Sequence, residues 1–302
     1  MGKASRRRKA RQQTRGEQGG SARPDPQSLP APFVARPFEG LPAETDWVAL
    51  REVVPAGTAA IRFTPPDGEP TDATVVSVLP LAWPGLHRGD GELLVALQSG
   101  NSSGDASRDV AQVLSSVADS EAGMPATTVP PPTLATPRLQ DLVDTSVPFE
   151  LTVHEGFDFW MADGAELDEE AKASLDRANE AAVPTARIAS VTSAYWCRIG
   201  ERTHIRWVLP HDEDRATDAL ARLHAAAESN LDDGSRLLGA FRACGLLVPV
   251  WDLDADQGAD AYEEPMADFA KRFEQALAST DSLDAAERRA RSGILSRQVT
   301  LR

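Results

Sequence analysis

The pattern of apolar and polar positions predicts helices and strands in alternation along the first half of the chain. One helix face is predicted from apolar residues at the spacing i, i+3, i+4 and i+7, namely Val110, Val113, Leu114 and Val117. Strands are predicted over AAIRFT at 59–64, TVVSVLPLAW at 74–83 and ELLVALQ at 92–98. Because the turn-forming sequence HRGDG lies between the last two runs, we expect them to pair as a hairpin.

Two further helices are predicted in this half. DWVALREVV at 46–54 places Trp47 and Leu50 on one side, with Thr45 or Asp46 as the N-cap, and residues 168–182 follow as a second helix.

The second half repeats this order of elements. Strands are predicted over 188–199, 204–210 and 245–251, with the turn GERT after the first of them. Two helices are predicted from apolar residues at helical spacing. The first carries Ala219, Leu220, Leu223 and Ala227, and the second carries Met266, Phe269, Ala270, Phe273 and Leu277. The phrases SVLPLAW at 77–83 and SVTSAYW at 190–196 mark the leading strand of each half.

We infer two copies of a strand-strand-helix-strand-helix unit, over 74–182 and 187–277. The copies match Trp83 with Trp196 and Trp160 with Trp251. Large aromatic side chains on a half-buried sheet usually belong to the core, but an exposed pair forms a stacking platform, so both interpretations stay open here.

The predicted architecture is an α+β fold in which two pseudo-repeated modules form one globular unit. Its parts are a disordered basic tail at 1–32, a first module at 33–183, a second module at 184–280, and a C-terminal helix and strand at 281–302. The last helix is expected over 284–291 with Gly293 as its stop, and the proline-rich stretch 124–137 is expected to be an inserted surface loop.

Charge is divided unevenly along the chain, whose net charge is −15. Residues 1–23 hold eight of the 31 Lys and Arg but one of the 46 Asp and Glu, so the remainder carries about −22. An acid-free run of basic residues suits phosphate backbones without base specificity: Lys3, Arg6, Arg7, Arg8, Lys9, Arg11 and Arg15. The alternative is a solubilising tail with no dedicated partner.

Composition predicts no metal site, no cofactor and no membrane span. Cys197 and Cys244 stand apart, with no histidine at metal-ligand spacing, and no phosphate-binding or dinucleotide-binding glycine motif is present. The basic N-terminus is not followed by an apolar segment of a secretory signal, so a cytoplasmic location is expected.

Two motifs suggest chemistry. GNSSG at 100–104 matches the G-x-S-x-G pattern, with Ser102 as nucleophile, Asp158 as acid and His204 or His211 as base. His154 and Glu155 form a second acid/base candidate.

An acidic run at 252–263 matches five ligand positions of a calcium-binding EF-hand loop. Gln257 replaces the required glycine at the sixth position, so an acidic lead into a helix is the preferred interpretation.

Several segments in order resemble an actinobacterial family of unknown function, domain of unknown function 5926. They include RPFEGLPAETDWVALREVVPA, RWVLPH, SRLLGAFRACGLLVPVWDL and ERRARSGILSRQVTLR, and they cover almost everything after Arg36. Many relatives carry a SEC-C zinc motif before this region, whose cysteines are absent here. The repeat unit also resembles the SseB N-terminal domain at the level of fold.

The leading functional prediction is a non-enzymatic binding or adaptor protein that contacts RNA or ribosomes through its basic arm. One alternative is a hydrolase that uses Ser102 or the region of His154 and Glu155. Another is a structural module that binds an unknown protein partner.

Overall fold

The computed structural model describes residues 26–66, 68–100, 102–166 and 168–296. The seven basic arm residues predicted to contact RNA lie outside this part of the chain. No helix within it combines the length and the apolar character needed to cross a bilayer.

The first half forms one sheet with helices around it. Its helices are α1 (Glu44–Glu52), α2 (Ala106–Ala118), α3 (Leu139–Leu142) and α4 (Glu169–Ala181), with short 3-10 turns at Pro26–Ser28, Pro80–Ala82 and Asp158–Trp160. Its strands are β1 (Gly57–Phe63), β2 (Thr71–Val76), β3 (Gly85–His87), β4 (Leu93–Ala96), β5 (Met124–Ala126) and β6 (Thr152–Val153), in the spatial order β5-β3-β4-β2-β1-β6.

The second half forms a five-stranded sheet. Its strands are β7 (Thr185–Ile188), β8 (Ala194–Ile199), β9 (Arg202–Trp207), β10 (Arg236–Ala243) and β11 (Leu246–Asp252), in the order β10-β11-β9-β8-β7. Its helices are α5 (Glu213–Ala225), α6 (Glu263–Ala278) and α7 (Ala285–Ser296), with a 3-10 turn at Ala259–Tyr262 before α6. The predicted α+β class is confirmed.

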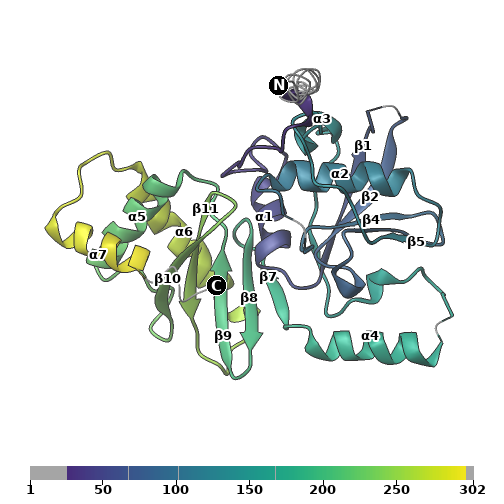
Figure 1. Ribbon diagram of the computed structural model, residues 1–302. Helices are drawn as coiled ribbons and strands as arrows, with labels where there is room; N and C mark the ends of the chain where they lie inside the picture. Colours follow the sequence, from purple (N-terminus) through teal and green to yellow (C-terminus); the bar gives the residue numbers. More distant parts are fainter. Residues whose placement is uncertain (1–25, 67, 101, 167, 297–302) are drawn as a thin grey trace, which may run out of the picture.

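The two sheets share a hydrophobic core around α1. Trp47 and Leu50 of α1 belong to the same buried cluster as Tyr195, Phe241 and Val248 of the second sheet. Figure 1 shows α1 between the sheets, with α2 lying across the first sheet. A second cluster joins α5 and α6 to the opposite face of the second sheet. The continuously buried strand β11 supplies both faces, with Val248 in the first cluster and Leu247 and Trp251 in the second, because successive strand residues point to opposite sides.

The predicted hairpin between 74–83 and 92–98 is wrong. β2 ends at Val76 and pairs with β4 in parallel, whereas the hairpin partner of β4 is the short strand β3. Between them Leu81 and Ala82 have φ angles of 52° and 54°, and Pro80 offers no N–H donor for a ladder. The chain therefore leaves the sheet and returns on the far side of β4.

The four tryptophans of the predicted repeat lie in unlike environments. Trp196 in β8 and Trp251 in β11 are buried in the second core. Trp83 follows a 3-10 turn and Trp160 ends one, so the strand predicted to run through Trp83 is wrong. Both half-buried rings pack on the outer face of the first sheet, against a small cluster of Val76, Leu79, Leu94 and Ala96.

Residues 26–32, which were predicted as part of the tail, belong to the described structure. Residues 26–34, which we call the strap, run along the proline-rich loop: Leu134 N donates to Leu29 O at 2.9 Å and Ala31 N donates to Pro132 O at 3.3 Å.

Two local predictions also differ from the structure. Met124–Ala126 of the proline-rich stretch is the edge strand β5 and not a loop. The N-cap of α1 is Ala43 and not Thr45 or Asp46.

The last helix passes through Gly293, so the predicted stop and a strand starting at Ile294 are wrong. Ile294 is 2% exposed in the second core, and Arg291 reaches Asp218 of α5 at 2.7 Å. This packing stabilises one more helical turn than the glycine alone favours. The remainder of the predicted strand, 297–302, lies outside the described residues.

Gly85→Ala is expected to destabilise the protein by about 2 kcal/mol, because extra volume in a packed core forces shifts. A Cβ atom at Gly85 meets the side chain of Val117 and lies 2.8 Å from Val113 Cγ1, both on α2. Urea denaturation measures the loss, with Gly89→Ala as control because that position is open. Equal stability of the two variants would show that α2 can move away from β3.

Candidate functional site

A cavity of about 320 Å³ lies where β4 leads into α2. It is lined by Arg51, Ala96, Leu97, Ser99, Gly100, Ser102, Ser103, Asp109, Val110, Val113 and residues 129–132. β4 runs parallel to β2, so the cavity lies at the carboxyl end of the parallel pair, where α/β sheets commonly bind ligands. We call it the α2 pocket.

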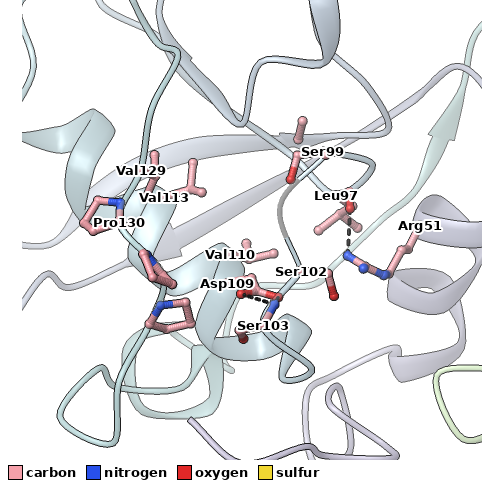
Figure 2. Close-up of a pocket in the computed structure, with 14 residues that line it drawn as sticks. Arg51, Leu97, Ser99, Ser102, Ser103, Asp109, Val110, Val113, Val129 and Pro130 are labelled. Carbon is pink, nitrogen blue, oxygen red and sulfur yellow. Dashed lines mark hydrogen bonds between the residues drawn. The ribbon is translucent and has the colours of Figure 1, made fainter. Parts of the chain in front are cut away.

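The two ends of the α2 pocket differ in charge. Figure 2 shows Val113, Val129 and Pro130 together on one side and Arg51 with Ser102 on the other, with Asp109 between them. The apolar side comes from α2 and the proline-rich loop, and Arg51 comes from the last turn of α1. The pocket therefore offers one apolar end and one charged end.

Two charged groups of opposite sign define the polar end. Both carboxylate oxygens of Asp109 accept from Ser103 N, at 3.2 and 3.1 Å. Burial raises the pKa of Asp109, and the hydrogen bonds from Ser103 oppose that rise. Arg51 Nη1 donates to Leu97 O at 2.7 Å, and its Nε lies 3.4 Å from Glu52 Oε1.

Ser102 lies exposed on this loop, and the structure does not bring it to a histidine. The five histidines have other partners: His87 with Ser120 O, His154 with Thr58, His204 with Asp252, His211 with Glu274 and His224 with Ser229. In addition, α2 starts at Ala106 with Asp105 as its N-cap, so the chain does not run from the serine straight into the helix. The hydrolase geometry predicted for Ser102 is absent from the described residues.

His154 lies in a second cavity, of about 920 Å³, on the outer face of the first sheet. Its Nε2 lies 2.8 Å from Thr58 Oγ1. Burial lowers the pKa of His154, and the charge of Asp158 in the same cavity opposes this. Glu155 is exposed and does not line the cavity, so the predicted pair of His154 and Glu155 is not assembled as one site.

The acidic run at 252–263 does not form a calcium loop. Asp252 ends β11, and the carboxylate of Glu263 accepts from Ala189 N at 2.8 Å and Ser190 N at 2.7 Å. Within the described ranges, no three His, Cys, Asp or Glu side chains are grouped to hold a metal ion.

The similarity of this chain to a known protein family extends over most of its length. A family model described as Family of unknown function (DUF5926) matches residues 37–302. The chain belongs to this family. Comparisons with curated proteins and with solved structures found no match. The DUF5926 region contains every residue of the α2 pocket and of the second cavity, whereas the strap and the arm precede it.

Sequence reasoning missed Arg51 and Asp109, the two charged residues of the α2 pocket in this DUF5926 chain. Arg51 occupies an ordinary polar position of a short amphipathic helix. Asp109 is a favourable acidic residue in the first turn of α2. No local sequence signal identifies them, because the parallel pairing of β2 with β4, which marks the loop after β4 as a binding position, is a non-local contact.

Proposed function

We propose that this protein is a non-enzymatic binding or adaptor protein that contacts RNA through its basic N-terminal arm. The observation that carries the proposal is the separation of charge: seven Lys and Arg precede residue 16 without an acid, on a body that carries about −22. Such a body repels polyanions, so the arm supplies the phosphate contacts.

The strap gives this arm a fixed origin on the body. Val34 N donates to Gly104 O at 2.9 Å, and Ala31 and Leu134 pair the strap with the proline-rich loop. Two loops of the first half therefore anchor residues 26–34, and the seven arm cations precede this anchored segment in the sequence, the last of them being Arg15. This arrangement supports a tether that leaves the folded body free to bind a partner.

Truncation to a chain beginning at Pro24 is expected to abolish RNA binding. Fluorescence anisotropy of labelled single-stranded RNA across a salt series measures this. If all seven arm cations contact phosphates, log K should fall with log salt at a slope of about −5. An equal affinity of the full and truncated chains would exclude the arm as the RNA contact.

A matched pair of double variants separates the arm from general charge. Arg7→Gln with Arg8→Gln should reduce the magnitude of the salt slope by about 1.4. Arg288→Gln with Arg289→Gln removes the same charge from exposed positions of α7 and should leave the slope unchanged. A change of equal size in both pairs would assign the binding to net charge alone.

A further inference from the structure

We propose that the α2 pocket binds a free α-amino acid with an aliphatic side chain. The proposal is independent of the RNA contact, because it concerns the folded body alone. A volume of about 320 Å³ lies at the lower end of the range of roughly 300–1,000 Å³ for ligand pockets, which suits a small metabolite.

The apolar end fits a branched hydrocarbon side chain. Val113 is 6% exposed and Val129 is 9% exposed, so the wall is part of the first core and is held rigidly by it. Pro130 continues this wall beside Val129 (Figure 2). No charged residue lines this end, so a polar side chain would lose its hydration there without a partner.

The charged end fits a carboxylate and an ammonium together. Arg51 uses one N–H on Leu97 O and directs its Nε toward Glu52, and a guanidinium has five N–H donors, so donors remain for a carboxylate. The carboxylate of Asp109 accepts from Ser103, through its backbone N–H and its side chain, and its remaining lone pairs can accept from an ammonium.

The order of these groups selects the ligand class. Figure 2 places Asp109 between the apolar wall and Arg51, and an α-amino acid carries its side chain, ammonium and carboxylate on one carbon. Asp109 would repel the carboxylate of a simple fatty acid, and Arg51 would repel the ammonium of a simple amine. Like charges at such sites oppose binding, so both charges on the ligand are required.

The test is isothermal titration calorimetry of the full chain with L-leucine, N-acetyl-L-leucine and L-leucinamide. L-Leucine should bind, and each analogue should bind at least about tenfold more weakly, because each lacks one charge-assisted hydrogen-bonding group. L-Glutamate should bind more weakly than L-leucine, because its side chain is charged. Absence of L-leucine binding, or equal binding of the analogues, overturns the proposal.

Variants locate the site. Asp109→Asn, which keeps the acceptor for Ser103 N, and Arg51→Met should each weaken L-leucine binding about tenfold. Asp119→Asn, at the exposed C-terminal end of α2, and Arg62→Met, on β1, should leave it unchanged. Circular dichroism checks that each variant is folded. L-Leucine binding that is unaffected by Asp109→Asn overturns the assignment to this pocket.

Discussion

Trp47→Ala is expected to lower the free energy of unfolding by about 4 kcal/mol, since removal of a buried tryptophan costs both transfer energy and a cavity. Trp47 is fully buried, and its ring stacks on Phe149 with centroids 4.1 Å apart and on Phe38 at 5.7 Å. These three rings belong to the cluster that also contains Phe241 and Val248 of the second sheet.

Because the two sheets share this cluster, the loss should affect the unfolding of both halves together. Urea denaturation followed by circular dichroism measures it, as one transition that moves to lower urea. The matched control is Trp83→Ala, whose half-buried ring lies outside this cluster and should cost about 2 kcal/mol. Two separate transitions, with only the first-half transition shifted, would contradict the shared core.

Asp46→Ala is expected to lower the free energy of unfolding by about 3 kcal/mol, because it leaves a set of buried partners unpaired. Asp46 is 4% exposed and accepts hydrogen bonds from Ser193 and from Tyr195 Oη, the latter at 3.0 Å. Arg187 Nη2 completes the set at 3.1 Å from Asp46 Oδ2. The pKa of Tyr195 is raised, mainly by burial and secondly by the charge of Asp46. The Tyr195 hydroxyl therefore stays protonated and donates its hydrogen bond.

The side chain of Arg187 is 35% exposed, so water can solvate its charge after the substitution and the expected loss lies at the lower end for a buried ion pair. Asp46→Asn retains one acceptor oxygen and should cost less. Asp72→Ala, which removes the surface pair with Arg62, serves as the control and should change stability little. If Asp46→Ala and Asp72→Ala had equal effects in urea denaturation, the network would not hold α1 to the second sheet.

The helices were the most predictable part of the fold. The apolar spacing from Val110 to Val117 predicted α2, and that face is buried as expected. The prediction of α4 over 168–182 agrees with the observed Glu169–Ala181 and its N-cap Asp168. Helical hydrogen bonds and faces are set by neighbours three and four residues apart, so the local sequence carries this information.

Strand pairing was predictable only where a short turn fixed it. The turn after Ile199 predicted the β8–β9 hairpin correctly. The strand β10 was missed, and the pairing of β2 with β4 was predicted as antiparallel although it is parallel. A hairpin is a local contact, whereas a parallel pair requires the chain to leave the sheet and return. Pro80 and the left-handed residues Leu81 and Ala82 make that excursion here.

The sequence by itself determined the fold class, the main helices, the family and the basic arm on an acidic body, because periodicity, motif order and charge are properties of the linear chain. Only the tertiary structure decided that the two sheets enclose α1 and that Arg51 and Asp109 line one pocket. These residues belong to helices separated by the strands β1 to β4. Their proximity depends on the parallel pairing of β2 with β4, a non-local contact that no local pattern encodes.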